Sequence, residues 1–382
     1  MVNLEEKLAE LEDRLAKTIP NKATMRSICS LKAQIAKLKN RIQDKILTSS
    51  KISSKDGFDV KKQGDSSVAL IGFPSVGKST LLNKLTNAQS KIAAYEFTTL
   101  DAIPGLMEYK HAKIMVIDLP GIIKGASKGK GMGKRILSVA KTANLILIML
   151  DIWNQPHIHL DIIEKELYDV GIRLDQFPPL ISIYKTQQGG VALTTTVSPL
   201  NHIDEDLVKS IFNEFRIINA LVTVHQDVTV DQVIDVLAGN RVYIPSLIIC
   251  NKMDISTAEQ EKFLEDLEKQ GKRIIRISAE TGLNLAELRE EIYHKLRLIN
   301  IFLKPKGKKA DLIEPLVVPE DSTVADVARR LHRDFVDKFR YAFVSTAIKD
   351  KYGNLRTEGK KFKVGLKYIL KDYDVLQINI RN

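Results

Sequence analysis

The fold of this chain is decided by a glycine-rich stretch near residue 75, which reads Gly72-Phe73-Pro74-Ser75-Val76-Gly77-Lys78-Ser79. It fits the pattern G-x-x-x-x-G-K-[ST], in which backbone N–H groups converge on phosphate oxygens at the start of a helix. An apolar run at 68–71 predicts a strand before it, and the residues from Thr80 predict a helix after it. We therefore expect a phosphate-binding loop, with Lys78 on the β- and γ-phosphates and the Ser79 hydroxyl on Mg²⁺.

Further apolar runs alternate with helical stretches after this loop. Runs of strand length occur at 113–117, 145–150, 246–250 and 274–277. Strands that are apolar along their whole length, and that alternate with helices, are typical of a parallel sheet covered on both faces. The sequence thus predicts an α/β fold built on the parallel sheet of a P-loop protein.

The first 64 residues follow a helical pattern. Apolar residues recur at spacings of three and four over 4–15 and again over 28–42, and Pro20 separates the two stripes. This periodicity predicts a helical hairpin or a short coiled coil. The polar stretch at 48–64 is rich in Ser, Lys, Asp and Gly, which is typical of a linker.

Two other regions lie outside the parallel sheet. The interval 175–240 is too long for a simple connection and carries its own strand, turn and helix signals, so we expect an inserted α+β subdomain. After residue 300 the basic run at 304–309 is interpreted as a linker, followed by a strand, a helix over 323–339 and two strands. The predicted domains are a helical hairpin with its linker (1–64), a nucleotide domain in two parts (65–174 and 241–299), the insertion (175–240) and a C-terminal module (300–382).

Positive charge is concentrated in the two flanks of the chain. The net charge is +11, with 14 Lys and Arg against 8 Asp and Glu in 1–64, and 18 against 11 in 300–382. Basic flanks on a near-neutral middle favour an anionic polymer such as RNA as a partner, whereas the simpler alternative is a set of solvated lysines. In the tail, Lys361, Lys363 and Lys367 alternate with apolar residues, which favours several charges on one strand face.

Composition indicates a cytoplasmic protein without a membrane segment. No run approaches the roughly 18 apolar residues of a membrane helix. The chain has 2 cysteines, Cys29 and Cys250, which are typical of a reducing compartment and not of a disulfide framework.

A second nucleotide motif, Asp118-Leu119-Pro120-Gly121, follows the apolar run at 113–117. The Asp118 carboxylate can hold Mg²⁺ through water, and the Gly121 N–H can contact a γ-phosphate. Between this motif and the phosphate loop lies Tyr95-Glu96-Phe97-Thr98-Thr99-Leu100. A threonine there can complete the Mg²⁺ shell only when the γ-phosphate is present, and Thr98 and Thr99 compete for that role.

The next motif, Asn251-Lys252-Met253-Asp254, indicates which base is bound. The Asp254 carboxylate can accept two hydrogen bonds from the N1–H and N2–H₂ groups of guanine, a donor pair that adenine lacks. Ser278 and Ala279 follow the last strand and can present a backbone N–H to guanine O6. In this order the motifs predict a protein that binds GTP in preference to ATP.

These motifs together resemble the developmentally regulated GTP-binding protein (DRG) family, within the larger Obg-related GTPases. The resemblance covers nearly the whole chain and also includes the segments at 239–245 and 304–307. It implies an N-terminal helical region, a G domain with an insertion, and a C-terminal TGS domain. It also implies an association with ribosomes, RNA and translation, and with a small stabilising partner protein.

The resemblance carries residue roles onto the matching positions. In Obg-like proteins the second threonine of the Phe-Thr-Thr segment ligates the metal, which favours Thr99 beside Ser79 as the metal ligands. The residues expected to act in catalysis are Lys78, Thr99, Asp118 and Gly121. The nucleotide-binding set is Gly72, Phe73, Pro74, Ser75, Val76, Gly77, Lys78, Ser79, Thr80, Phe97, Thr98, Thr99, Asp118, Gly121, Asn251, Lys252, Asp254, Ser278 and Ala279.

The hydrolysis rate is expected to be slow. Ile122 stands where Ras-like GTPases carry a glutamine that orients water, and isoleucine cannot do so. Some relatives use K⁺, held partly by a P-loop asparagine; Ser75 occupies that position here, so K⁺ as a cofactor stays open. The leading hypothesis is a slow GTP-hydrolysing switch acting on ribosomes or RNA in translation. The alternatives are an RNA or ribosome tether with a structural nucleotide site, and an ATPase of the Obg-like branch, against which Asp254 argues.

Overall fold

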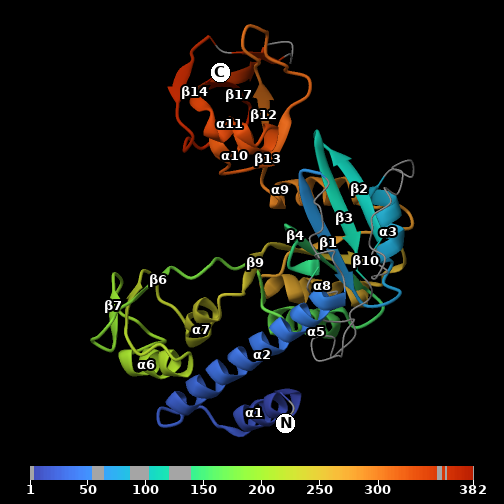
Figure 1. Cartoon of the computed structure of the whole chain (residues 1–382). Coiled ribbons are helices and arrows are strands. Elements are labelled where there is room, and N and C mark those ends of the chain that lie inside the picture. Colours follow the sequence, from blue (N-terminus) through green and yellow to red (C-terminus); the bar gives the residue numbers. More distant parts are fainter. Residues whose placement is uncertain are drawn as a thin grey trace. The chain divides into compact units, whose positions relative to one another are not determined.

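The computed structural model describes residues 4–53, 64–86, 103–119, 139–350, 355–357 and 359–381 (Figure 1). The chain divides into two compact units. The smaller unit comprises 1–60, 125–141 and 164–244, and the larger comprises 61–124, 142–163 and 245–382. Each unit has hydrophobic cores of its own. Within the part of the chain that the structure describes, no helix is long and apolar enough to cross a membrane.

The larger unit contains a six-stranded sheet with the order β11-β10-β4-β1-β3-β2. Its neighbouring strands pair in parallel except β2, which is antiparallel to β3. Every residue of β1 and β4 is buried, as expected for central strands covered on both faces. The strands are β1 (Ser66–Gly72), β2 (Ile103–Tyr109), β3 (Ala112–Asp118), β4 (Leu145–Asp151), β10 (Ser246–Asn251) and β11 (Ile274–Arg276).

The α/β prediction is confirmed, with one strand added. Strand β2 was not predicted, because Pro104 and Gly105 lie at its start and both residue types weaken a strand signal. Helices α3 and α9 contribute leucines and an isoleucine to the same core as the sheet. The helices of this nucleotide domain are α3 (Lys78–Leu85), α5 (Pro156–Asp169), α8 (Ala258–Lys269) and α9 (Leu285–Lys295), with a 3₁₀ turn η1 (Met253–Ile255).

The C-terminal module is a second sheet with the order β13-β12-β17-β14-β15, and β16 also pairs with β14. The predicted helix over 323–339 is wrong in extent, because the backbone becomes extended at His332 and Phe339 already belongs to a strand. The basic run at 304–309 is a loop inside this sheet and not a linker, since β12 precedes it and pairs with β13 after it. The elements are β12 (Leu298–Leu303), β13 (Leu316–Pro319), α10 (Val324–Leu331), α11 (Asp334–Asp337), β14 (Phe339–Lys349), β15 (Leu355–Thr357), β16 (Phe362–Val364) and β17 (Asp374–Ile380).

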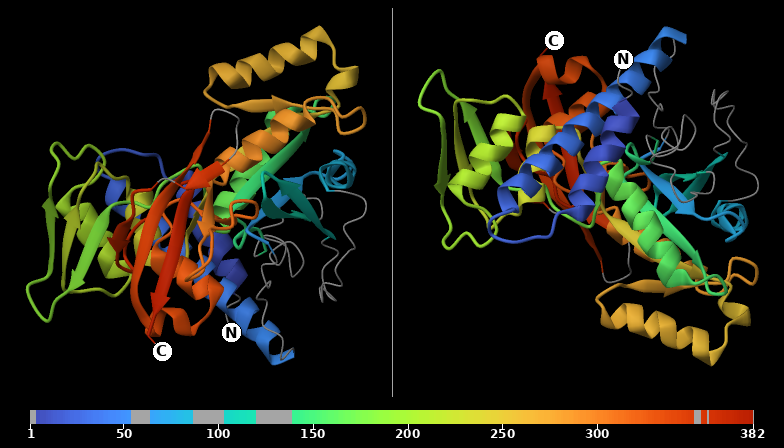
Figure 2. Two further views of the ribbon diagram at one scale, coloured as in Figure 1. Left: turned by 90° about the horizontal axis from the view of Figure 1, so that it is seen from above. Right: turned by 90° about the horizontal axis from the view of Figure 1, so that it is seen from below.

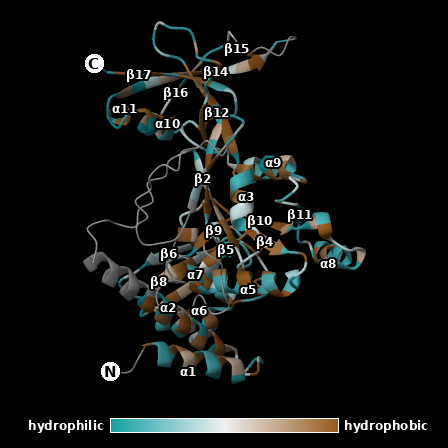
Figure 3. Cartoon of the chain, turned by 90° about the vertical axis from the view of Figure 1, so that its right-hand side faces the viewer, coloured by the Kyte–Doolittle hydropathy of each residue, from teal (hydrophilic) through white to brown (hydrophobic). Residues whose placement is uncertain are grey.

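The smaller unit begins with the predicted helical hairpin, formed by α1 (Leu4–Lys17) and α2 (Met25–Ser53). Leu11 of α1 packs against Leu31, Ile35 and Leu38 of α2. Figure 3 shows hydrophobic and hydrophilic residues alternating along α1, as on an amphipathic helix. The linker predicted from residue 48 begins too early, because α2 continues to Ser53; Ser and Lys are tolerated in a helix that is already formed.

Helix α2 also completes the core of the inserted region. Its Cys29, Ala33 and Ala36 are buried with side chains from the insertion, whose sheet has the order β6-β8-β7. Figure 2 shows α2, in blue, beside the green and yellow elements of the insertion. The second helix of the predicted hairpin is therefore also part of the hydrophobic core of the insertion. The remaining elements are β5 (Ile172–Leu174), β6 (Ile181–Lys185), β7 (Val191–Thr195), α6 (Glu205–Glu214), β8 (Ala220–Val224), α7 (Val230–Ala238) and β9 (Val242–Ile244).

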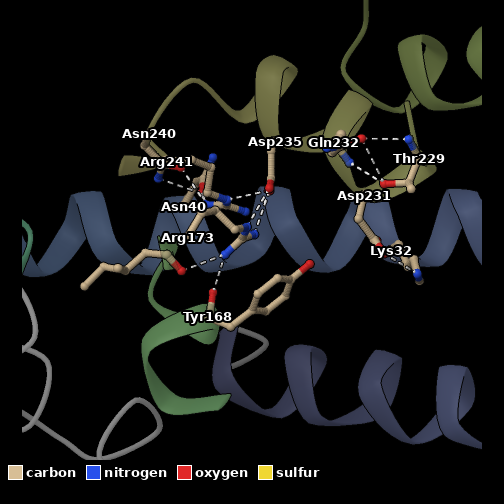
Figure 4. Close-up of polar contacts among 11 residues, drawn as sticks. Lys32, Asn40, Tyr168, Arg173, Thr229, Asp231, Gln232, Asp235, Asn240 and Arg241 are labelled. Atoms are coloured by element: carbon tan, nitrogen blue, oxygen red, sulfur yellow. Dashed lines mark hydrogen bonds and ion pairs between the residues drawn. The ribbon is translucent and has the colours of Figure 1, made fainter. Parts of the chain in front are cut away.

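A buried ionic network joins these segments (Figure 4). The Asp235 carboxylate accepts from Arg173 Nε at 2.7 Å and Nη2 at 2.8 Å, and from Arg241 Nε at 2.8 Å. The Arg241 side chain also reaches Asn40 of α2, and the Arg173 guanidinium lies 3.6 Å from the centre of the Tyr168 ring. The Arg173 and Asp235 side chains are 4% and 6% exposed. Each charge is therefore stabilised by its ionic partner and not by hydration.

We expect Asp235→Asn to lower the free energy of unfolding of this unit by about 3–5 kcal/mol, because two buried guanidinium groups lose their carboxylate. Urea unfolding monitored by circular dichroism measures the change. The matched control is Asp231→Asn, whose carboxylate pairs with Lys32 and is 43% exposed; its loss should stay within about 1 kcal/mol. If the two variants lost the same free energy of unfolding, the buried ion pairs of Asp235 would be no more stabilising than the exposed pair of Asp231.

Candidate functional site

The phosphate loop connects β1 to α3 at the carboxyl edge of the parallel sheet. Gly77 caps α3 with a φ of 98°, a left-handed conformation that favours glycine. A Cβ at Gly77 would lie 2.5 Å from Asn251 Nδ2, and one at Gly72 would lie 2.6 Å from the Met149 carbonyl oxygen. Both glycines are therefore required by close packing. Pro74, Ser75, Ser79 and Thr80 are exposed along the rim, whereas Val76 is buried.

The Lys78 side chain lies inside the loop that it follows. Its Nζ donates to the carbonyl oxygens of Gly72 at 3.2 Å and Phe73 at 2.9 Å. Burial lowers the pKa of Lys78, and the nearby Asp118 carboxylate opposes that shift. The loop therefore holds a desolvated ammonium group in place, which is suited to binding phosphate oxygens.

Ser79 and Asp118 meet across the site. The Ser79 hydroxyl donates to Asp118 Oδ2 at 2.7 Å, and burial raises the pKa of the Asp118 carboxyl. Among the residues that the structure describes, Asp118 Oδ1 is buried without a hydrogen-bond partner. Carboxylate and hydroxyl oxygens are the ligands that Mg²⁺ prefers, and an unpaired buried carboxylate oxygen needs a cation or a donor. The residues present thus fit a Mg²⁺ ion.

Asn251 connects the phosphate loop to the segments expected to bind the base. Its Nδ2 donates to the Val76 carbonyl oxygen at 2.9 Å, and its Oδ1 accepts from the Ala279 N–H at 2.8 Å. Asn251 is 3% exposed, so both hydrogen bonds lie away from water. This side chain therefore fixes the distance between the two halves of the site.

Lys252 reaches an acidic residue that the motifs did not indicate. Its Nζ lies 2.7 Å from Asp151 Oδ2, and the Asp151 side chain is fully buried at the end of β4. Asp151 also accepts from the Trp153 N–H at 3.0 Å and from Asn154 Nδ2 at 2.7 Å. A carboxylate that ends a wholly apolar strand is a sequence signal that would have found it.

His159 of α5 is a further neighbour of the loop. Its ring stacks on Phe73 with centroids 3.9 Å apart and an interplanar angle of 16°. Burial lowers the pKa of His159, so the neutral imidazole is favoured against the aromatic ring. Nothing in the spacing of the histidines indicated this contact.

Asp254 is exposed in η1, and it forms no hydrogen bond or ion pair with any residue that the structure describes. Its carboxylate can therefore accept two hydrogen bonds from a ligand. The N–H groups expected to meet guanine O6 have internal acceptors, with Ser278 N–H bound to the Leu283 carbonyl at 3.3 Å and Ala279 N–H bound to Asn251. The guanine O6 contact stays a prediction, and it requires the Ala279 N–H to be shared.

Phe97, Thr98, Thr99 and Gly121 lie outside the described residues, as does Ile122. Their roles in metal binding, γ-phosphate contact and hydrolysis stay predictions. The structure brings together the phosphate loop, Asp118, the 251–254 motif and the 278–279 segment at one edge of the sheet.

Family models match the chain over most of its length. The model described as a 50S ribosome-binding GTPase matches residues 67–185, the model of the C-terminal region of that domain matches 188–298, and the TGS domain model matches 299–379. The predicted TGS domain is thereby confirmed.

Curated relatives match over nearly their whole length. The chain is 48% identical over 382 residues to an uncharacterized GTP-binding protein of Methanocaldococcus jannaschii, covering 100% of this chain and 94% of that one. It is 42% identical over 379 residues to developmentally-regulated G-protein 3 of Arabidopsis thaliana, covering 99% of each. It is 42% identical over 375 residues to ribosome-interacting GTPase 1 of Saccharomyces cerevisiae, covering 98% of each.

The geometry at the sheet edge, the three family models and these full-length relatives agree, and the chain belongs to the developmentally regulated GTP-binding protein family of P-loop GTPases.

Proposed function

We propose that this GTPase is a slow molecular switch that acts on ribosomes or their RNA during translation. GTP and Mg²⁺ binding are supported by the hydrogen bond between Ser79 and Asp118, whose second carboxylate oxygen is buried without a partner among the described residues. The desolvated ammonium group of Lys78 lies near this pair. The ribosomal part is supported by the name of the yeast relative, by the description of the matching family model and by the basic flanks.

Each residue at the phosphate end has a proposed task. Lys78 would exchange the carbonyls of Gly72 and Phe73 for β- and γ-phosphate oxygens, and Ser79 and Asp118 would hold the Mg²⁺ ion. When bound, Mg²⁺ neutralises charge that develops on the phosphates. Thr99 is the proposed second protein ligand, and Gly121 N–H the proposed contact to the γ-phosphate.

The base end discriminates by hydrogen bonding. We assign Asp254 to N1–H and N2–H₂ of guanine and Ala279 N–H to O6. Beside Asp254, the Lys252 side chain is held in place by its ion pair with Asp151. Against adenine, the Asp254 carboxylate would meet no matching donor pair, which disfavours ATP.

Further partners are proposed on the resemblance alone. A small stabilising protein and a cytoplasmic location fit the family, and K⁺ as a second cation is left open because Ser75 occupies the relevant position. A tether with a purely structural nucleotide site is less well supported, since Lys78, Ser79 and Asp118 are all arranged for metal and phosphate.

We expect Asp254→Asn to weaken GTP binding at least about tenfold and to admit xanthine nucleotides, because an amide reverses the donor and acceptor pattern. Isothermal titration calorimetry with GTP, XTP and ATP measures this change in base specificity. Glu259→Gln removes an exposed carboxylate on the neighbouring helix and should leave all three affinities unchanged. Equal ATP and GTP affinity in the unmodified protein would refute the assignment.

Unassisted turnover should be on the order of 10⁻⁴ to 10⁻² s⁻¹, because Ile122 cannot orient the attacking water. Phosphate release under single-turnover conditions gives this rate, with and without K⁺. Ile122→Ala should change it by less than about threefold, since neither side chain is polar. A much larger loss of rate in that variant, with GTP binding intact, would show that the residue takes part in hydrolysis.

Ribosome association should depend on the bound nucleotide. Co-sedimentation of the full chain with ribosomes is expected to be strongest with a non-hydrolysable GTP analogue and weakest with GDP. Lys78→Ala, which removes the phosphate-binding ammonium, should lose that difference. Co-sedimentation that is the same in every nucleotide state would favour the tether over the switch.

A further inference from the structure

The outer face of the C-terminal sheet carries two aromatic rings next to each other. Ala342 and Val344 of β14 enter the core that α10 shares with the sheet, so Tyr341 and Phe343 point to the opposite side. Their ring centroids are 5.3 Å apart with an interplanar angle of 74°. Both rings are half-buried, and the sheet fixes their position.

Polar side chains border these rings on the same face. Asn379 lies opposite Tyr341 in the antiparallel pairing with β17, and Gln377 lies opposite Phe343. Asn379 Nδ2 is buried without a partner among the residues that the structure describes. Gln377 is half-buried, and its amide group can pair with the edges of nucleic-acid bases.

Cations complete the outer face. The Lys363 ammonium lies 4.7 Å from the centre of the Tyr341 ring, and the Arg340 guanidinium lies 5.8 Å from it. Both side chains are exposed, and neither forms an ion pair with an acidic residue in the described part of the chain. Near this sheet, the contact with Lys361 and the repulsion between the two ammonium groups lower the pKa of Lys304. Lys363 and Arg340 therefore place positive charge beside the Tyr341 ring.

The strand pairing corrects one expectation about this charge. Lys361, Lys363 and Lys367 alternate with apolar residues in the sequence, but β16 extends only over Phe362–Val364. Lys363 pairs with Phe343 and so lies beside the rings, whereas Lys367 lies beyond the strand. The outer face of the C-terminal sheet is therefore characterised by the aromatic residues of β14 with Lys363 beside them, and not by a row of alternating lysines.

We propose that the outer face of the C-terminal sheet binds a short unpaired RNA segment, with bases stacked on Tyr341 and Phe343 and phosphates contacting Lys363 and Arg340. The proposal rests on the proposed action on ribosomes or RNA and specifies which RNA structure is bound. Aromatic rings and nearby cations on a sheet are suited to single strands, because stacking needs bases that are free of a partner strand. Lys363 can leave the Tyr341 ring for a phosphate, since cation–π contacts at exposed sites are weak.

The first test measures binding of a fluorescein-labelled 12-nucleotide oligouridine to the full chain by anisotropy. Tyr341→Ala and Phe343→Ala should each weaken binding about five- to tenfold, because each removes one stacking ring. Tyr341→Phe keeps the ring and should bind like the unmodified protein. Tyr184→Ala is the matched control, since Tyr184 is an exposed strand tyrosine in the smaller unit.

Salt dependence separates phosphate contacts from stacking. Lys363→Ala should reduce the slope of log affinity against log salt by roughly 0.7, the value for one phosphate contact on a single strand. Lys262→Ala removes an exposed charge from α8 and should leave the slope unchanged. Equal slopes in the two variants would show that Lys363 contacts no phosphate and would overturn that part of the proposal.

A second measurement does not depend on the folding of any variant. Oligouridine carrying 4-thiouridine is cross-linked to the unmodified protein, and the linked peptides are identified by mass spectrometry. Cross-links at 339–345 and 361–365 are expected. Cross-links confined to other segments, or unchanged oligouridine affinity in both alanine ring variants, would overturn the proposal even if ribosome association persists. Failure of the unmodified protein to sediment with ribosomes would instead count against the proposed function.

Discussion

The carboxamide of Asn251 is the interaction on which the nucleotide site depends. It contacts the Val76 carbonyl on one side and the Ala279 N–H on the other, inside a region closed to water. An amide can do this because it has a donor and an acceptor on one rigid plane. The phosphate end and the base end of the site are thereby held at a fixed separation.

The parallel sheet makes that contact reachable. β1, β4 and β10 run in the same direction and end at the same edge, so their following loops converge. The same edge concentrates ionisable groups, with Lys78, Asp118 and Asp151 all buried there. Burial of such groups is unfavourable without partners. The Lys78 ammonium group is stabilised by two carbonyl oxygens, and the Asp151 carboxylate by Lys252. One oxygen of Asp118 has no partner among the described residues and is available to a cation.

The sequence was most informative where one physical requirement dominated. Strands β1 and β4 are buried on both faces, so their uninterrupted apolar runs could be recognised directly. β2 could not be predicted, because Pro and Gly weaken the sequence signal of a strand. They are tolerated here because β2 is an edge strand that pairs only with β3 among the described strands. The helix after Thr323 is shorter than predicted, because the backbone turns extended at His332 where no Gly or Pro signals an end. Asp151 could have been noticed, because it ends an otherwise wholly apolar strand. His159 could not, because its contact with Phe73 joins segments that are far apart in the sequence.

The shared core of α2 and the insertion has a consequence for synthesis. Cys29, Ala33 and Ala36 emerge from the ribosome early, but the side chains that cover them come from residues beyond 180. Until then the nascent helix presents an apolar stripe with only the α1 face covered. Contacts of such long sequence separation form slowly, and the stripe is prone to aggregation or chaperone binding during that interval. The elongation rate up to the end of the insertion thus sets how long this helix stays uncovered.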